Sequence, residues 1–193
     1  MTREKHHYHD DRERRTWQNP EAILIGIGLT LDRTFVDIGC GDGFFAIPAA
    51  KIVGPRGRAY GIDIDADALD RLRAKAHEEG LTNIFLHQGA AEEILLCKDC
   101  ADVVFFGIDL HDFDDPARVL HNAREIIRDG GIVVDLDWKK EPQPLGPPLA
   151  KRFDADQAVA LMECAGFRVV SVAESGIYHY LIVAEPADLP TPE

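Results

Sequence analysis

The chain has 193 residues, of which 46% are hydrophobic, and a formal net charge of -13 at pH 7. This size suits one well-packed domain, and the acidic balance argues against a nucleic-acid partner, because binding a phosphate backbone needs clustered Lys and Arg. No apolar run is long enough to span a bilayer and no signal peptide is evident, so we expect a cytoplasmic protein without a membrane partner. No pattern in the sequence indicates an oligomeric state.

Residues 1–19 form a polar arm rich in histidine, which we expect to be loosely ordered up to about Trp17 and able to act as a lid. A helix is predicted to begin near Pro20, because proline suits the first turn of a helix. One domain should extend over residues 20–185, and residues 186–193 should form a frayed tail.

Between these ends, apolar runs typical of strands alternate with segments typical of helices. The predicted strands cover residues 34–39, 58–64, 83–88, 101–108, 131–138, 166–174 and 177–185, and the predicted helices cover residues 20–29, 44–54, 66–80, 116–131 and 154–166. The alternation indicates βαβ units around a parallel sheet. Only a short turn around Ser175 and Gly176 joins the last two strands, so the last strand should be antiparallel.

The stretch VDIGCGDG, residues 36–43, places a glycine-rich loop between the first of these strands and the helix after it. One candidate ligand is a dinucleotide, because Gly41, Gly43 and Ala46 fit the pattern G-x-G-x-x-G/A. Its pyrophosphate would, however, lie close to Asp37 and Asp42. A ligand with a free amino-acid end fits better, since its carboxylate can meet the loop amides and its ammonium can meet Asp37. S-adenosylmethionine has both groups, and its sulfonium also favours a nearby acid.

The strand that follows this unit ends at Asp63, about twenty residues after the loop, where a carboxylate can accept both hydroxyls of a ribose. This feature indicates a nucleoside without deciding which one, because NAD enzymes share it. The alternative is that Asp63 or Asp65 caps the helix beginning near Ala66.

The loop DIGCGDG, the strand end GIDID, the strand series and the closing hairpin together resemble the class I S-adenosylmethionine-dependent methyltransferases over about residues 20–185. The resemblance implies a Rossmann-like three-layer α/β/α sandwich. Its seven-stranded, mostly parallel sheet would have the order 3-2-1-4-5-7-6, with the last strand antiparallel. It also implies an enzyme that transfers a methyl group to a small-molecule acceptor. A His followed by an acid after the fourth strand, at His111, resembles the small-molecule branch of the family, which includes quinone C-methyltransferases.

By this resemblance the glycine loop holds the methionine part of the cofactor, Asp63 holds the ribose, and the residues after the third strand lie at the adenine. The expected cofactor-binding residues are Asp37, Gly39, Cys40, Gly41, Gly43, Asp63, Ile64, Gly89, Ala90, Ala91, Glu92 and Phe106. Many members have an acid at the position of Ala90. We therefore expect adenine recognition to fall to backbone groups or to Glu92.

The candidate catalytic residue is His111, because a histidine whose pKa lies near neutrality can take a proton from a nucleophile. Its alternative roles are a polar pocket wall or a hydrogen bond to Asp112 or a loop carbonyl. Asp137 and Trp138 end the fifth strand beside the expected methyl group, and Trp138 offers a face to a cationic or aromatic acceptor. Trp17 is the candidate lid over the cofactor.

Two other functions stay open on the sequence: an NAD(P)-dependent oxidoreductase, and a non-catalytic protein that binds S-adenosylmethionine. No metal site is predicted. Cys97 and Cys100 should be reduced thiols in a loop, since no second pair of cysteines follows to complete a zinc site. The arm histidines, His6, His7 and His9, would form a metal site only by folding onto His111 or the Tyr178–Tyr180 segment.

Overall fold

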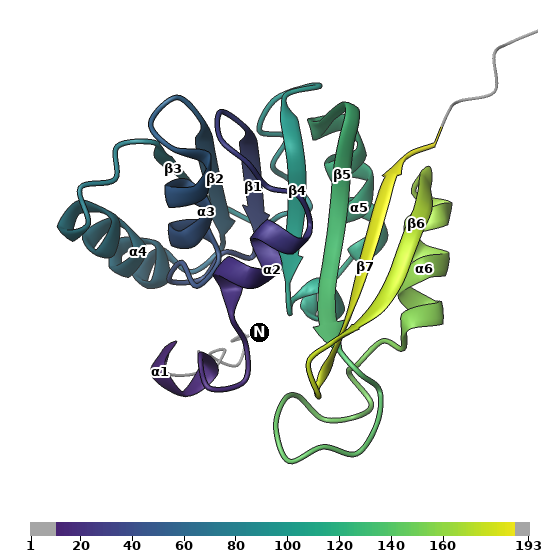
Figure 1. Cartoon of the computed structure of the whole chain (residues 1–193). Coiled ribbons are helices and arrows are strands. Elements are labelled where there is room, and N and C mark those ends of the chain that lie inside the picture. Colours follow the sequence, from purple (N-terminus) through teal and green to yellow (C-terminus); the bar gives the residue numbers. More distant parts are fainter. Residues whose placement is uncertain (1–10, 188–193) are drawn as a thin grey trace, which may run out of the picture.

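The computed structural model describes residues 11–187 and shows helices on both faces of one sheet (Figure 1). The strands are β1 (Thr34–Ile38), β2 (Arg58–Asp63), β3 (Ile84–Gln88), β4 (Ala101–Gly107), β5 (Ile127–Trp138), β6 (Phe167–Ser175) and β7 (His179–Pro186). The helices are α1 (Asp11–Arg14), α2 (Pro20–Gly26), α3 (Ala46–Val53), α4 (Ala66–Glu78), α5 (Pro116–Ile126) and α6 (Ala155–Cys164), and a short 3-10 helix, Leu110–Asp112, follows β4.

The strands lie in the order β3-β2-β1-β4-β5-β7-β6, which confirms the predicted topology. The strands from β1 to β5 pair in parallel, whereas β7 is antiparallel to both β5 and β6. The reversal follows from the short turn before β7, which cannot make a parallel crossover. The parallel strands all end at one edge of the sheet, the lower edge in Figure 1. In open sheets of this kind, ligands bind at that edge.

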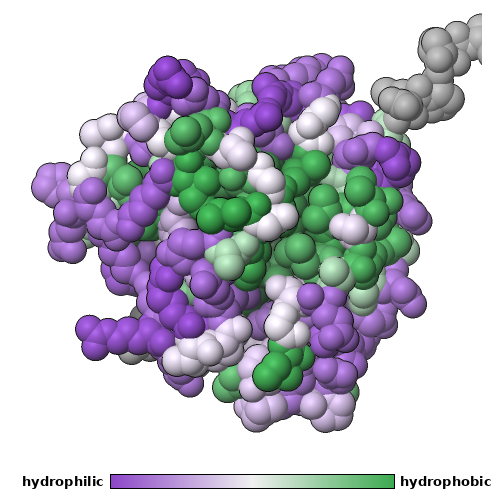
Figure 2. Space-filling view, in the orientation of Figure 1, coloured by the Kyte–Doolittle hydropathy of each residue, from purple (hydrophilic) through white to green (hydrophobic). Residues whose placement is uncertain are grey.

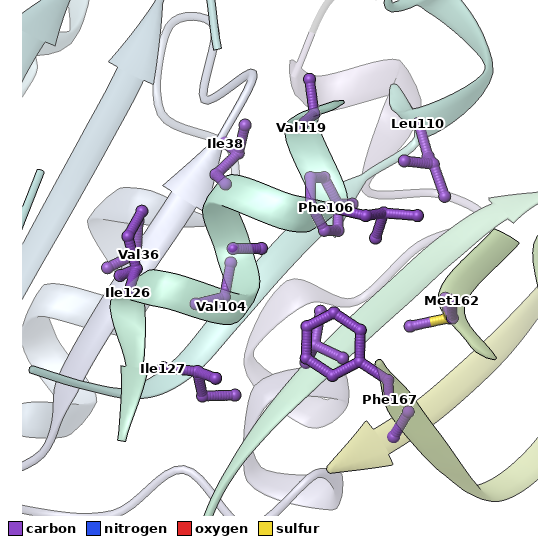
Figure 3. Close-up of a cluster of buried hydrophobic side chains, with 14 of the residues drawn as sticks. Val36, Ile38, Val104, Phe106, Leu110, Val119, Ile126, Ile127, Met162 and Phe167 are labelled. Atoms are coloured by element: carbon purple, nitrogen blue, oxygen red, sulfur yellow. The ribbon is translucent and has the colours of Figure 1, made fainter. Parts of the chain in front are cut away.

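Side chains that alternate along the central strands fill a separate core on each face of the sheet. On one face, Val36, Val104 and Phe106 belong to a buried cluster that includes residues of α5 and α6 (Figure 3). On the other, Phe35 and Phe105 pack near α2 and α3, with ring centroids 5.7 Å apart. Figure 2 shows apolar side chains gathered across the middle of this second face. Burial on both faces explains the continuous apolar character of β4.

Several boundaries differ from the prediction. The helix expected to reach Gly131 ends at Ile126, and β5 begins directly after it. The helix ends there because Ile127 is already extended, with a φ of -76° and a ψ of 133°. Gly130, inside β5, has a φ of 73°, which a right-handed helix also excludes. The fifth strand therefore starts earlier than expected, with an irregular register against β4.

Both ends of the domain also hold more structure than expected. The segment before Trp17, expected to be loosely ordered, contains α1, because Lys75 of α4 holds the carboxylate of Asp11 at 2.8 Å. β7 continues to Pro186, and the N–H of Ala187 donates to the carbonyl of Gly166 at 2.9 Å, so the predicted tail begins within the sheet. The histidines of residues 1–10 and the final residues 188–193 lie outside the described residues.

Cys97 and Cys100 are joined by a disulfide, so the prediction of two reduced thiols is wrong. Their Cα atoms lie 6.1 Å apart in the loop before β4, within the range that a disulfide spans. Among residues 11–187, no three His, Cys, Asp or Glu side chains are grouped so that they could hold a metal ion. No helix in the same range is long and apolar enough to cross a membrane.

Candidate functional site

A cavity of about 470 Å³ opens where β1, β2, β4 and β5 end. Small-molecule sites typically have volumes of roughly 300–1,000 Å³. Its wall combines the glycine loop, the tip of β2, residues 89–92, the segment after β4 and part of the loop 139–154 that joins β5 to α6. Arg14 of α1 completes the wall, and α1 lies beside the strand ends in Figure 1. Segments far apart in the sequence therefore build one site.

The glycine loop is held tightly by bonds within the chain. Four of its backbone N–H groups donate to the chain's own oxygen atoms: those of Gly39 and Cys40 to Ile62, that of Gly41 to Asp63 and that of Gly43 to Cys40. At Gly43, φ is 98°, a left-handed value that suits glycine, and a Cβ there would overlap the side chain of Leu72 on α4. The loop is thus a rigid cavity wall, with fewer amides left for a ligand than the sequence suggests.

Asp63 lies at the centre of this arrangement. Its Oδ2 accepts from the N–H of Gly41 at 2.7 Å and its Oδ1 from the N–H of Asp65 at 2.9 Å. The carboxylate lines the cavity, and each oxygen has a second lone pair for a ligand hydroxyl. Capping of α4 belongs to Asp65, whose side chain accepts from the N–H groups of Asp67 and Ala68. Asp65 therefore caps α4, whereas Asp63 lines the cavity.

Two further carboxylates are buried in the cavity wall. Asp37, at the end of β1, is 2% exposed, and its Oδ2 has no hydrogen-bond partner within residues 11–187. Burial raises the pKa of Asp37 to about 7, with Arg14 lowering and Asp63 raising it. Burial also raises the pKa of Asp109 well above its usual value, and the charges of Asp37 and Asp137 add to the effect. The cavity therefore has an acidic wall that favours a positive charge.

His111 follows β4 and is fixed by two acids. Its Nδ1 lies 2.8 Å from both carboxylate oxygens of Asp137, and its Nε2 lies 3.4 Å from Oδ2 of Asp112. Burial lowers the pKa of His111, but the hydrogen bond and the charge of Asp137 outweigh it, so the pKa is raised overall. Because Asp137 faces Nδ1, the neutral ring would keep its lone pair on Nε2. This pairing, together with the contact to Asp112, makes His111 a firmly oriented polar group.

Trp138 and the loop 139–154 form the wall on the side of β5. Trp138 is 2% exposed and lines the cavity together with Gly146 and Pro147. The loop is gathered around Arg152, whose guanidinium donates to the carbonyls of Pro147, Lys139, Glu141 and Leu145 at 2.8–3.2 Å. Arg152 also lies 5.5 Å from the centre of a Trp138 ring. One arginine thereby organises the wall of a long irregular loop.

The N-terminal arm contributes Arg14 to the cavity. The guanidinium lies 4.0 Å from the centre of the Phe44 ring, and its Nε donates to Gln18 at 2.7 Å. Trp17 instead stacks on His179, with ring centroids 5.3 Å apart, and lies 5.6 Å from Trp138. In the described part of the chain, Arg14 lines the cavity and Trp17 does not.

The sheet order, the reversed last strand, the glycine loop and the acid at the tip of β2 occur together at this site. A family model described as a methyltransferase domain matches residues 30–180, which include the glycine loop and Asp63. The chain belongs to the class I S-adenosylmethionine-dependent methyltransferases.

Named methyltransferases are similar to this chain in sequence and structure. The demethylmenaquinone methyltransferase of Halalkalibacterium halodurans is 32% identical over 110 residues, which are 57% of this chain and 45% of the relative. The ubiquinone/menaquinone biosynthesis C-methyltransferase UbiE of Vibrio parahaemolyticus is 30% identical over 147 residues, 76% of this chain and 54% of the relative. The chain thus spans about half the length of these relatives. The crystal structure of a SAM-dependent methyltransferase from Aquifex aeolicus has a TM-score of 0.84 and 26% identity, covering 92% of this chain and 98% of that chain.

Most of the residues predicted to bind the cofactor lie in the cavity wall. They are Asp37, Gly39, Cys40, Gly41, Asp63, Ile64, Gly89, Ala90, Ala91 and Glu92. Phe106 does not: its side chain is fully buried in the core against α5, because its position along β4 points it into that face (Figure 3). Gly43 packs on α4 behind the loop and does not line this cavity. Glu92 accepts from the N–H groups of Asp114 and Asp115 while also lining the cavity.

Of the residues predicted to bind the acceptor, some line the cavity and others do not. His111 and Trp138 line the cavity, whereas Asp137 lies behind His111 and is 1% exposed. Sequence reasoning missed several cavity residues, among them Arg14, Phe44, Phe45 and Asp109. Asp109 carried a usable signal, since it is an acid just after a buried strand, like Asp63. Arg14 had none, because nothing local connects the arm to β1 or β4.

Proposed function

We propose that the protein is a methyltransferase that uses S-adenosylmethionine to methylate a small molecule. The observation that carries the proposal is Asp63, which lines the cavity with both oxygens oriented by backbone N–H groups of the glycine loop and the α4 cap. Such a carboxylate suits the two hydroxyls of a ribose. Family membership and the volume of the cavity support the same function.

The residues present fit a cofactor that is cationic at its reactive centre. Asp37 and Asp109 bring buried carboxylate oxygens that lack hydrogen-bond partners in the described chain, and a positive ligand would offset the energetic penalty of ionising them. When bound, S-adenosylmethionine supplies an electrophilic methyl group on a sulfonium. Ile64 and residues 89–92 form the apolar and backbone-rich part of the wall that suits adenine. Asp63 lies between these two regions.

We infer that the acceptor lies against His111 and Trp138. Methyl transfer needs the acceptor held in line, and a base only where the acceptor atom carries a proton. With Asp137 orienting Nδ1, the Nε2 of His111 is the atom that would take that proton. Trp138 supplies an aromatic surface beside it, held by the loop around Arg152.

Ligand binding tests the proposal and separates the two halves of the cavity. S-adenosylhomocysteine should raise the melting temperature, and NAD and NADP should not. Asp63→Asn should lower the affinity for S-adenosylhomocysteine about tenfold or more in calorimetry, because charge-assisted hydrogen bonds contribute roughly 1.5–3 kcal/mol each. His111→Gln should bind S-adenosylhomocysteine like the wild type, because it lies on the acceptor side.

Stabilisation by NAD with none by S-adenosylhomocysteine would instead support an oxidoreductase. A large loss of S-adenosylhomocysteine affinity in His111→Gln would move His111 from the acceptor to the cofactor. In either case the assignment above would be wrong.

A further inference from the structure

The carboxylate of Asp109 is buried in the wall of the cavity. Both oxygens are buried and neither has a hydrogen-bond partner within the described chain, although the residue lines the cavity. A buried polar group without a partner costs about 1–3 kcal/mol, and more when it is charged. The same holds for Oδ2 of Asp37 on the neighbouring strand. Unpaired groups of this kind, facing a cavity, indicate a ligand with a complementary charge.

The backbone is shaped to bring Asp109 to this position. Ile108, just before it, has a φ of 77°, a left-handed value that is a clear outlier for a β-branched residue, and its N–H is anchored to the carbonyl of Leu136 at 2.8 Å. Gly39 faces Asp109 from the glycine loop, and a Cβ at that position would overlap the carboxylate. The left-handed backbone at Ile108, just after β4, and the absent side chain at Gly39, just after β1, together make room for Asp109 beside the loop.

Arg14 provides the opposite charge on the other side of the same space. Its half-buried side chain lies over Phe44, and Nε bonds to Gln18, while one terminal nitrogen lies 3.5 Å from the carbonyl of Gly107. The charges of Asp37 and Asp109 act on Arg14. Within residues 11–187, however, no nitrogen of Arg14 lies within 4.0 Å of a carboxylate oxygen of Asp37 or Asp109, so neither acid forms an ion pair with Arg14. A gap thus separates one guanidinium from two carboxylates.

The arm that carries Arg14 is anchored on both sides of the loop. Nζ of Lys75 on α4 lies 2.8 Å from Oδ2 of Asp11 and 2.8 Å from Oδ2 of Asp42. This bridge links α1, which carries Arg14, to the glycine loop. Ion pairs within the protein therefore hold the helix that carries Arg14 next to the cavity.

We propose that Arg14 and Asp109 are the two ends of a clamp for the zwitterionic amino-acid end of the cofactor. The guanidinium of Arg14, which keeps N–H donors on its terminal nitrogens beside the bond from Nε to Gln18, receives the α-carboxylate, and Asp109 receives the α-ammonium, with Asp37 beside it. Four loop amides already donate within the chain, so the loop supplies shape while these side chains supply the charges. This inference rests on the proposed function, because it assumes a cofactor with a methionine end.

Two ligands that differ only at the clamp test it by calorimetry. S-adenosylhomocysteine carries the amino-acid end, whereas 5′-methylthioadenosine keeps the adenine, ribose and sulfur without it. Arg14→Gln and Asp109→Asn should each lower the affinity for S-adenosylhomocysteine about ten- to a hundredfold, at roughly 1.5–3 kcal/mol for a charge-assisted bond. Each should leave the affinity for 5′-methylthioadenosine within about twofold of the wild type.

Asp63→Asn is the matched control, because the ribose is common to both ligands and both affinities should fall together. Thermal unfolding verifies that each variant is folded, and the two clamp variants test the proposal independently. If both ligands weaken equally in Arg14→Gln and Asp109→Asn, or neither weakens, the clamp is refuted. If the wild type binds neither ligand, the proposed function itself fails, a result distinct from binding without a clamp.

Discussion

At the scale of single residues, Asp63 and His111 show that a site residue here also serves the local fold. Asp63 holds the N–H of Gly41, so it shapes the loop beside which its ligand would lie. Because of this hydrogen bond, removing the carboxylate of Asp63 would also disturb the loop. His111 likewise satisfies the buried carboxylate of Asp137. Substitutions at such positions act on the stability of the fold as well as on any ligand contact, so each needs a conservative variant and a control.

The pairing of His111 with Asp137 predicts a pH-dependent contribution to stability. The folded-state pKa of His111 is raised above its unfolded value near 6.5, so protonation stabilises the fold below about pH 6.5. This contribution is lost as pH rises through the folded-state pKa. His111→Gln should therefore reduce the free energy of unfolding more at pH 6 than at pH 9, as measured by urea denaturation.

The exposed His77 on α4 gives the control for this measurement, and His77→Gln should leave both values nearly unchanged. An equal effect of His111→Gln at the two pH values would mean that the ring stays neutral in the fold. The pair of His111 and Asp137 would then contribute to stability only through a hydrogen bond from a neutral imidazole.

At the scale of elements, the site depends on pieces that carry little regular structure. The loop 139–154 has no helix or strand of its own, and Arg152 replaces them by binding four of its carbonyls. The short α1 depends in the same way on Lys75, which belongs to α4. Both pieces flank the cavity, so its shape rests on two basic side chains as well as on the sheet.

Loss of Arg152 should open the loop 139–154 and leave the sheet intact. Arg152→Met removes four hydrogen bonds from a charged donor, and we expect it to lower the free energy of unfolding by about 2–4 kcal/mol. Trypsin should then cleave faster after Lys139, Lys140 or Lys151, as mass spectrometry of limited digests would show. Arg56→Met, at a side chain that is 79% exposed, should change neither value. Unchanged cleavage in Arg152→Met would mean that packing on Trp138 suffices to hold the loop.

At the scale of the whole molecule, negative charge is concentrated where the parallel strands end. Asp37, Asp63, Asp135 and Asp137 lie on three of those strands, and Asp109 follows a fourth. Burial raises the pKa of Asp37, Asp109 and Asp135, so the ligand-free protein holds protons at an edge that a cationic cofactor would favour. Ionising these buried acids therefore lowers the stability of the fold, although their negative charge would raise the affinity for a cationic ligand.

This conflict predicts that Asp37 costs stability as pH rises. The native state keeps the proton of Asp37 up to a pKa of about 7, whereas the unfolded chain releases it near 3.8, so the native state binds more protons between these values. Relative to Asp37→Asn, the wild type should lose about 2–3 kcal/mol between pH 5 and pH 8, at about 1.4 kcal/mol per pH unit. Urea denaturation of both proteins at the two pH values measures this difference.

Asp70→Asn, at a side chain that is 72% exposed, provides the comparison and should follow the wild type at both pH values. A difference between wild type and Asp37→Asn that does not change with pH would show that Asp37 ionises freely in the folded protein. The acidic edge would then impose no penalty on the fold.

The sequence by itself determined the order of strands and helices, the reversed last strand and the location of the cofactor loop. These features follow from local properties: apolar periodicity, glycines in the loop, an acid at the end of β2 and a connection too short for a crossover. The interval between the predicted strand 131–138 and the predicted helix 154–166 also indicated the loop before α6, although the boundary between α5 and β5 lies earlier than predicted.

Only the tertiary structure decided which side chains face the cavity. Arg14 and Asp109 are 95 positions apart in the sequence, yet both line the same cavity. Phe106 points into the core, and the carboxylate of Asp137 is hydrogen-bonded to His111. Such contacts depend on how distant segments pack and on which face of a strand a residue occupies, and a local pattern does not encode either. The glycine loop illustrates the difference: its position could be read from the chain, but the partners of its amides could not, because Asp63 and Ile62 reach it from another strand.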